Sequence, residues 1–236
     1  MTLRTLKEWK PASLDDMILT ARFREVLEAY FTQNAGELMS MFLVGTPGLG
    51  KSTLARIIAN HFAWSEVWRT QLTDDEWWTG NRLNEKEISR LLQAISSHGK
   101  ALDAEFRKDG QRALFVIDEL QVLTLNHQRR LNSALEAENG PCIIATSNLD
   151  GKDVVAKNTA SRFEIFDFDE LTKPQHRDEI VDDMVRVAKR AIKSVGASTN
   201  ALSDSALRDI AESTNMDFRK FFEKFSREVF LASRKA

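Results

Sequence analysis

Short apolar runs alternate with helix-like segments along the first 170 residues of the chain. Two of these runs, 113–118 and 142–147, are apolar at almost every position, which is typical of strands covered on both faces of a sheet. Apolar residues at three- and four-residue spacing predict helices at 52–62 and 85–96. The predicted strands are 41–45, 67–72, 113–118, 142–147 and 163–168. This alternation predicts an α/β fold with a parallel five-stranded sheet flanked by helices.

The pattern changes after residue 170, where three helix-like segments follow one another without an intervening strand. Thr172 and Ser203 stand before the first two segments and are candidate N-caps, because a hydroxyl there can accept a backbone N–H. We therefore predict two domains, a nucleotide-binding α/β domain over residues 1–170 and a small three-helix lid domain over residues 171–236.

The composition narrows the class of protein. Hydrophobic residues make up 42% and charged residues 29% of the chain, a balance typical of soluble proteins. No apolar run approaches the length that crosses a bilayer, and the first residues lack the apolar core of a secretion signal, so we expect a cytoplasmic protein and no membrane partner. Cys142 is the only cysteine, which excludes a disulfide within one chain and a cysteine-based zinc site.

The sequence GTPGLGKS at 45–52 has the spacing of a phosphate-binding loop. Its glycines let backbone N–H groups approach phosphate oxygens, and the helix that begins there favours anions at its N-terminus. Lys51 would add a positive charge, and the Ser52 hydroxyl would ligate Mg²⁺. A chance glycine turn of this spacing is expected in about one such chain in a hundred. The loop therefore predicts nucleotide binding by Gly45, Thr46, Pro47, Gly48, Leu49, Gly50, Lys51 and Ser52.

Two carboxylates and an amide stand at the ends of predicted strands, where parallel sheets place ligand chemistry. Asp118 would hold Mg²⁺, directly or through water, and Glu119 would orient and polarise the attacking water. The alternative, a solvated pair after a strand, is disfavoured by the phosphate-binding loop in the same chain. Asn148 could hold the attacking water near the γ-phosphate, or it could be a turn residue of the segment SNLDG.

Two arginines are candidates for transition-state stabilisation. Arg162 stands just before the predicted strand 163–168, and Arg219 opens the last predicted helix. Each could stabilise charge on the transferring phosphoryl group, and each could equally be a surface arginine. The residues alone leave that choice open.

Together these motifs resemble those of AAA+ ATPases and, within that class, of clamp-loader ATPase subunits from tailed phages and replication factor C. GTPGLGKS resembles Walker A, LFVIDE resembles Walker B, and IIATSN resembles the sensor 1 strand. ASRF resembles the Ser-Arg-Cys motif, DFRKFF resembles sensor 2, and HQRRLNSALEAE resembles the glutamine-containing helix of clamp loaders. EWKPASLDDMI resembles the N-terminal segment that covers the adenine. The resemblance spans about residues 8–230.

The resemblance implies an ATP site in which Trp9 and Pro11 cover the adenine and Thr53 joins Lys51 on the phosphates. It implies that Arg219 reaches the γ-phosphate of its own subunit and that Arg162 acts on ATP bound by a neighbour. The partners it implies are other AAA+ subunits in a pentamer-type ring or spiral, a sliding clamp, and primer–template DNA in a phage or prokaryotic host cytoplasm. Candidate DNA-phosphate contacts, each of which could also be a solvated surface residue, are Arg82, Lys86, Arg90, Arg129 and Lys152.

The chain departs from the clamp-loader pattern at three points of the sequence. Phe163 replaces the usual cysteine, Met216 replaces a glycine, and Walker B continues as Leu120-Gln121 instead of a second acid. The resemblance also implies a collar domain, which would follow the lid. Two other functions therefore stay open. One is a helicase loader or another DNA-remodelling AAA+ ATPase, such as a transposition regulator. The other is a nucleotide-binding assembly subunit with incidental hydrolysis, against which the intact Glu119 counts.

Overall fold

The computed structural model describes residues 9–32, 38–62, 78–79, 114–136, 141–148, 157–196 and 202–234, together with residues 86, 88, 89, 92, 93 and 95. The chain forms two compact units. We call Ala29–Thr46 with Ile58–Asp167 the sheet unit. We call Met1–Glu28, Pro47–Ile57 and Phe168–Ala236 the helical unit. The helical unit thus contains an N-terminal segment and most of the phosphate-binding loop besides the C-terminal helices.

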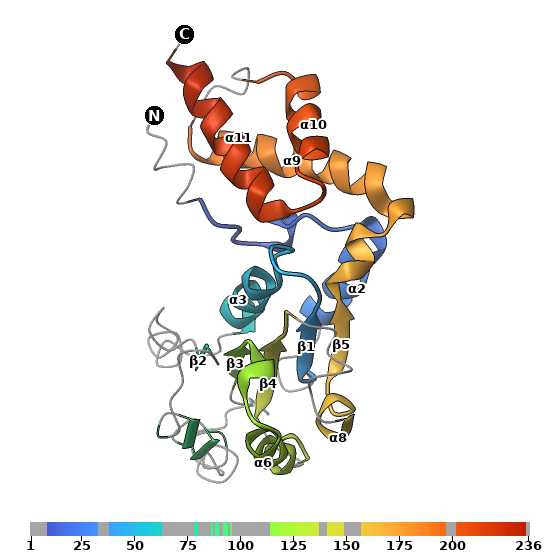
Figure 1. Ribbon diagram of the computed structural model, residues 1–236, viewed down its shortest axis with the longest axis vertical. Coiled ribbons are helices and arrows are strands. Elements are labelled where there is room, and N and C mark those ends of the chain that lie inside the picture. Colours follow the sequence, from blue (N-terminus) through green and yellow to red (C-terminus); the bar gives the residue numbers. More distant parts are fainter. Residues whose placement is uncertain are drawn as a thin grey trace. The chain divides into compact units, whose positions relative to one another are not determined.

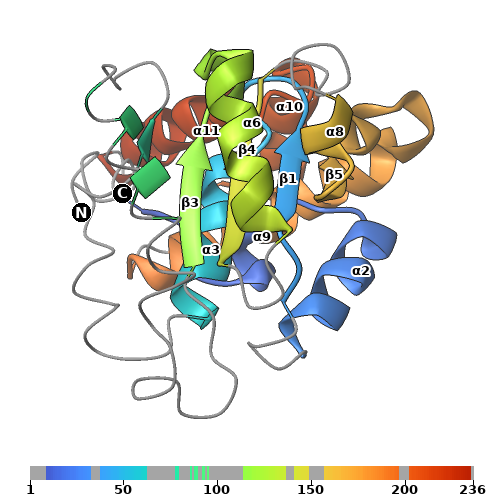
Figure 2. The same cartoon turned by 90° about the horizontal axis from the view of Figure 1, so that it is seen from below.

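The sheet unit is built on parallel strands in the order β2-β3-β4-β1-β5 (Figure 1), and Figure 2 shows β3, β4, β1 and β5 in this order from the end of the molecule. The strands are β1 (Met41–Val44), β2 (Trp78–Thr79), β3 (Leu114–Asp118), β4 (Cys142–Thr146) and β5 (Glu164–Asp167). The predicted parallel α/β fold is confirmed, and β1, β3, β4 and β5 lie where strands were predicted. The predicted strand at 67–72 lies outside the described residues.

Apolar side chains from strands and helices form the core of the sheet unit. The helices with residues in this unit include α6 (Leu125–Leu135), α8 (Lys157–Ala160) and the ends of α2 (Ala21–Phe31) and α3 (Lys51–Phe62) (Figure 1). In the predicted helix 85–96, the six described residues are helical. The central core cluster joins these residues to the sheet; it contains Phe42, Val44, Ile88, Leu92, Ile95, Ile117, Leu120, Leu123, Leu131, Ile143, Ala145 and Phe163.

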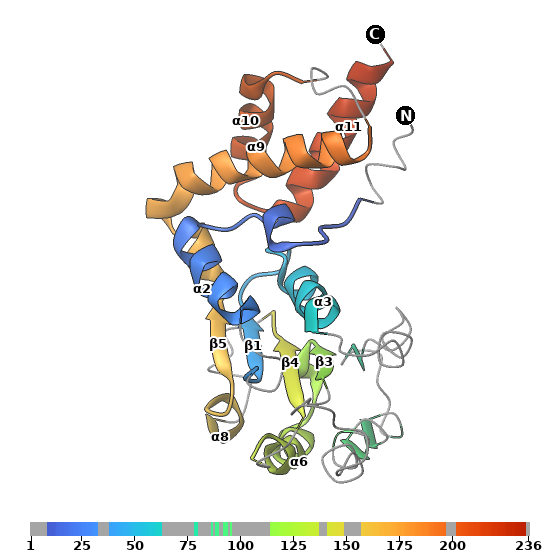
Figure 3. The ribbon, with the colours of Figure 1, turned by 180° about the vertical axis from the view of Figure 1, so that it is seen from behind.

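The C-terminal helices of the helical unit are α9 (Arg177–Ser194), α10 (Asp204–Ser213) and α11 (Phe218–Ser233), and both α10 and α11 pack against α9 (Figures 1 and 3). Short 3₁₀ turns at Leu14–Asp16, Phe168–Thr172 and Pro174–His176 belong to the same unit. Ser203 caps α10 as predicted, since its hydroxyl accepts the Ala206 N–H. The predicted cap at Thr172 is wrong, because Pro174–His176 first forms a 3₁₀ turn and α9 begins only at Arg177.

Asp183 on α9 anchors the N-terminal segment to the helical unit. Its carboxylate accepts the Leu19 N–H at 2.8 Å and pairs with Arg24 at 3.2 Å. Arg24 also donates to the Leu14 carbonyl, and Arg186 donates to the Met17 carbonyl. The side chains of Asp183 and Arg24 are mostly buried, so these charge-assisted bonds are well shielded from solvent.

Among the described residues, no helix combines the length and apolar character needed to span a membrane.

Candidate active site

The predicted site residues divide between the two units. The helical unit holds Trp9, Pro11, residues 47–53 of the phosphate-binding loop, and Arg219. The sheet unit holds Gly45, Thr46, Asp118, Glu119, Asn148 and Arg162.

The phosphate-binding loop combines glycine-dependent backbone geometry with a helix N-terminus. The φ angles of Gly45, Gly48 and Gly50 are +126°, +93° and +94°, a region that residues with a side chain rarely adopt. Helix α3 begins within the loop motif at Lys51, which is buried, and Ser52 is exposed in its first turn. Backbone N–H groups at such a turn and helix start attract anions. The loop therefore fits a phosphate group, with Lys51 supplying positive charge.

The loop packs tightly against the start of α11 within the helical unit. A methyl group added to Gly48 would lie 2.9 Å from the Asp217 Oδ1 atom and 3.7 Å from the Arg219 Cβ atom. A glycine at this position therefore serves close packing as well as backbone freedom. Asp217 is the N-cap of α11, and its carboxylate accepts the Lys220 N–H at 3.0 Å. The cap thus stabilises the first turn of α11, which the loop contacts.

The electrostatic surroundings of Asp217 favour its charged form. Burial alone would raise the pKa of this carboxyl, but hydrogen bonds from Lys220 and the charge of Lys220 together lower its pKa below the ordinary 3.8. A negative charge at a helix N-terminus is also favoured by the helix dipole. The capped start of α11 is therefore stabilised by an ionised Asp217 at neutral pH.

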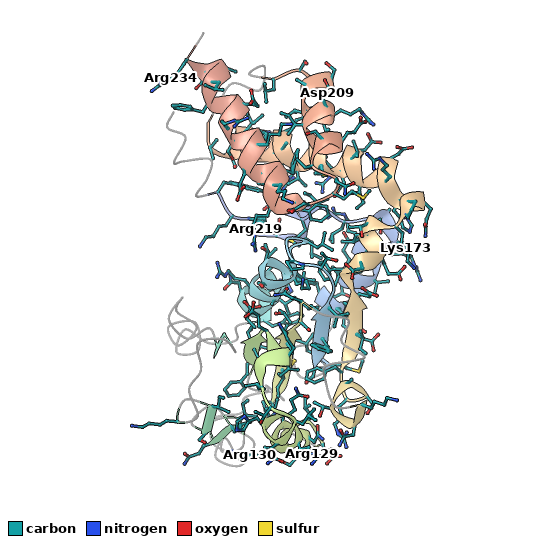
Figure 4. The ribbon with its side chains drawn as sticks, in the orientation of Figure 1. Arg129, Arg130, Lys173, Asp209, Arg219 and Arg234 are labelled. Atoms are coloured by element: carbon teal, nitrogen blue, oxygen red, sulfur yellow. The ribbon has the colours of Figure 1, made fainter. Side chains whose placement is uncertain are left out.

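A pocket of about 1040 Å³ lies in the helical unit beside α11. Trp9, Pro11, Thr53 and Arg219, all predicted nucleotide ligands, contribute to its lining. The Trp9 ring contacts the Phe222 ring of α11 with centroids 5.5 Å apart. Arg219 lies near the beginning of α11 (Figure 4). Side chains that the sequence did not indicate add further positive charge to the lining: Lys10, Lys220, Lys224 and Arg227.

The turn between α10 and α11 explains one departure from the clamp-loader pattern. Asn215 and Met216 have φ angles of +49° and +61°, in the left-handed region that favours glycine. Met216 therefore keeps the backbone conformation for which glycine is suited, at a conformational cost of about 1–3 kcal/mol. Its side chain is 7% exposed, so burial of its apolar surface offsets part of this cost.

In the sheet unit, the parallel pairing of β3 with β4 brings the predicted catalytic residues together. Ile117 pairs with Ala145, so Asp118 and Thr146 are level at the ends of the two strands. Glu119 follows β3 in the left-handed conformation, with φ +60° and ψ +51°. The Asn148 Nδ2 group donates to the Glu119 Oε1 atom at 3.1 Å. Asn148 is therefore a partner of the predicted catalytic carboxylate and not only a turn residue.

Arg162 is held by neighbours within its own chain. It follows α8, donates to the Asn158 carbonyl and forms an ion pair with Glu136 at the end of α6. The side chains of Arg162 and Glu136 are 26% and 56% exposed, so the ion pair is open to solvent. The next residue, Phe163, is buried in the core and contacts the Phe42 ring. Phe163, at the position where the clamp-loader resemblance implies a cysteine, thus contributes an aromatic ring to the core of the sheet unit.

Of the predicted DNA contacts, two lie in the described part of the chain. Lys86 and Arg129 are exposed, and Arg129 and its neighbour Arg130 lie on α6 (Figure 4). Arg82, Arg90 and Lys152 lie outside the described residues. Exposed positive side chains suit phosphate contacts.

Comparison with known proteins identifies the family. The model of the ATPase family associated with various cellular activities (AAA) matches residues 41–171, which is more than half of the chain. The chain belongs to this family. The predicted ATPase is thereby confirmed, because the matched domain is an ATPase domain. None of the curated proteins compared with this AAA ATPase matches it.

Several solved structures share the AAA fold seen here. Domain III of the Thermotoga maritima replication initiation protein DnaA has a TM-score of 0.52 at 16% identity, covering 95% of this chain and 96% of that one. DnaA bound to AMPPCP and single-stranded DNA has a TM-score of 0.58 at 16% identity, covering 92% and 64%. An arginine-to-alanine variant of Thermotoga maritima RuvB has a TM-score of 0.51 at 18% identity, covering 92% and 72%. At these identities the likeness shows a common fold, and the narrower clamp-loader resemblance stays a prediction.

Substitution of Gly48 tests the packing of the loop against α11. Gly48→Ala forces a rare backbone conformation and places a methyl group against Asp217. We expect the free energy of unfolding to fall by about 2–3 kcal/mol, measured by chemical denaturation. Gly196→Ala is the matched control, because Gly196 also has a positive φ but no atom within 4 Å of an added methyl group. The control should lose about 1 kcal/mol. Equal losses would contradict a packing role for Gly48.

Substitution of Asp217 tests the charged cap through its pH dependence. Asp217→Ala should lower the free energy of unfolding by about 1 kcal/mol at pH 7. Because folding lowers the pKa of Asp217, its charge stabilises the fold above the ordinary pKa of 3.8 and stops doing so as pH falls through the folded-state pKa. The difference from wild type should therefore shrink below about pH 4. Ser203→Ala removes an uncharged cap, and its effect should not change with pH; parallel profiles for both variants would refute the charge effect.

Proposed function

We propose that this AAA ATPase is a subunit of an oligomeric assembly that hydrolyses ATP to act on DNA, and more narrowly that it loads a sliding clamp onto primer–template DNA. The observation that carries the hydrolytic part is the hydrogen bond from Asn148 to Glu119 at the end of the paired strands β3 and β4. A carboxylate held by an amide at this sheet edge is suited to accept a proton from water or to polarise it.

The nucleotide-binding residues would have complementary roles. The loop N–H groups, Lys51 and Thr53 would bind phosphates, while Ser52 and Asp118 would hold Mg²⁺. Mg²⁺ is commonly held by one or two protein ligands together with phosphate oxygens and supplies charge neutralisation there. Trp9 and Pro11 would cover the adenine in the pocket of the helical unit, and Arg219 would contact the γ-phosphate. Glu119 would then prepare the attacking water, with its carboxylate oriented by Asn148.

Arg162 would complete the site of a neighbouring subunit. An arginine supplied by a partner raises phosphoryl-transfer rates by about 10³–10⁵ in GTPases that receive one, because it stabilises charge in the transition state. Arg162 is partly exposed, and its partner Glu136 is an exposed carboxylate whose attraction is screened by water. Arg162 can therefore exchange the Glu136 carboxylate for a phosphate oxygen at a small cost in free energy. Hydrolysis would then depend on assembly.

The DNA part of the proposal is supported by fold likeness and charge. The DnaA structure that shares the fold holds a nucleotide analogue and single-stranded DNA. Lys86 and Arg129 are exposed here and could neutralise DNA phosphates without reading sequence. The clamp-loader part is supported by Ser161-Arg162 and Asp217-Phe218-Arg219, whose pattern also occurs in those subunits. A helicase loader would keep the same nucleotide residues and differ only in its partner.

Mixing two inactive variants tests whether Arg162 acts between subunits. Arg162→Ala and Glu119→Gln should each reduce ATP hydrolysis at least tenfold, the first by removing the arginine and the second by removing the carboxylate. An equimolar mixture should hydrolyse ATP clearly faster than either variant alone, because some interfaces then combine an intact Glu119 with an intact Arg162. Arg208→Ala is the matched control, since Arg208 is also paired with an exposed carboxylate, that of Asp182. A mixture no faster than its components would refute action in trans.

A retention experiment tests the partner. The Glu119→Gln variant, immobilised with ATP and primed DNA, should retain the sliding clamp and not the replicative helicase of its source. Lys51→Ala should retain neither, because it weakens phosphate binding. Retention of the helicase instead would identify a helicase loader. Retention of neither, together with a Glu119→Gln variant equal to wild type in every activity, would identify a nucleotide-binding assembly subunit.

A further inference from the structure

Thr146, the last residue of β4, is hydrogen-bonded to both Asp118 and Glu119. We propose that Thr146 is a positioning residue for hydrolysis, which fixes the backbone of Glu119 and the carboxylate of Asp118 through a single hydroxyl. The proposal rests on the proposed hydrolytic roles of Asp118 and Glu119. It adds a role for Thr146, which lies in the segment IIATSN but is not among the site residues predicted from the sequence.

The Thr146 hydroxyl makes two hydrogen bonds whose directions are set by their partners. Its Oγ1 atom accepts the Glu119 N–H at 3.0 Å and donates to the Asp118 Oδ1 atom at 2.5 Å. A hydroxyl has one hydrogen to donate and lone pairs to accept, so it can serve both partners at once. Thr146 is 2% exposed, so water cannot readily replace either bond. The Thr146 hydroxyl therefore connects the two acidic residues directly.

The bond to Glu119 supports a backbone conformation that glutamate rarely adopts. Strand β3 ends at Asp118, and the chain turns at Glu119 into the left-handed region. Such a conformation persists where the surrounding structure holds it in place. The Thr146 hydroxyl supplies a partner for the N–H at the point where the chain leaves the strand. Without that hydroxyl, the direction in which the Glu119 side chain leaves the sheet edge is less well determined.

Thr146 and Asn148 bind different groups of the two acidic residues, Asp118 and Glu119. Asn148 holds the Glu119 carboxylate, whereas Thr146 holds the Glu119 backbone and the Asp118 carboxylate. A hydrogen bond that orients a metal-binding carboxylate commonly changes metal affinity or activity by about 10–100-fold when it is removed. The hydroxyl of Thr146 should therefore influence both hydrolysis and the dependence of ATP binding on Mg²⁺.

Two pairs of side chains at position 146, threonine with valine and serine with alanine, separate the effect of the hydroxyl from the effect of side-chain shape. Thr146→Val keeps the branched shape and removes only the hydroxyl. Thr146→Ser and Thr146→Ala both remove the γ-methyl group and differ from each other in the hydroxyl. The second pair covers the case in which the valine variant fails to fold. Thermal unfolding of each full-length variant establishes that the fold is retained before the comparison is made.

Hydrolysis is the first readout. The valine and alanine variants should lose about 10–100-fold in kcat, while KM for ATP changes little and the serine variant stays within about threefold of wild type. Folded valine and alanine variants with the wild-type kcat would overturn the positioning role, and so would a serine variant as impaired as the alanine variant. If wild type is no faster than Glu119→Gln, the proposed hydrolysis fails, and the second readout decides the role of Thr146 alone.

Mg²⁺-dependent ATP binding is the second readout, measured in the Glu119→Gln background so that hydrolysis does not contribute. Affinity for ATP in the absence of Mg²⁺ should be the same with threonine, serine, valine or alanine at position 146. The Mg²⁺ concentration that gives half of the added affinity should rise about tenfold or more with valine and alanine, but not with serine. An unchanged Mg²⁺ requirement in the variants without the hydroxyl would show that Thr146 does not orient Asp118.

Discussion

The parallel register of β3 and β4 is the constraint on which the candidate active site depends. It sets Asp118 level with Thr146 and brings Glu119 within reach of Asn148, although the two segments are separated by almost 30 residues of chain. A shift of one residue would turn every side chain of one strand to the other face. The buried apolar residues of both strands oppose such a shift, because each side chain would have to leave the packed site that it fills. Packing of the core thus determines the arrangement of the polar groups.

The start of α11 has a comparable role in the helical unit. Asp217 caps the helix, lies against the phosphate-binding loop at Gly48 and precedes Arg219, which lines the pocket. Loop packing, helix capping and the placement of a predicted phosphate ligand therefore depend on one short segment. Met216 maintains the turn before this segment in a conformation suited to glycine, and its buried side chain contributes apolar contacts that a glycine would lack.

The ion pair between Arg162 and Glu136 bears on the proposal that Arg162 acts on the site of a neighbouring subunit. The arginine that the sequence singles out is engaged by an exposed carboxylate of its own chain, in a pair that solvent weakens. Such a pair can hold a side chain in place without preventing its transfer to a stronger anion such as a phosphate. The chain shares the AAA fold with DnaA and RuvB, and this fold does not specify the surfaces that would select a partner.

The sequence by itself determined the elements with strong local signals. Continuous apolar runs predicted the buried strands, helical periodicity predicted α3 and α9–α11, and the loop GTPGLGKS predicted a glycine-rich turn between β1 and α3. It did not predict the 3₁₀ turn that displaces the start of α9 to Arg177, because a proline near a helix start is compatible with either geometry. Tertiary structure decided which distant polar groups meet: Thr146 with Asp118 and Glu119, Gly48 with Asp217, and Arg162 with Glu136. The physical reason is that periodicity records which face of an element is apolar, whereas these contacts depend on strand register and packing between segments far apart in the chain.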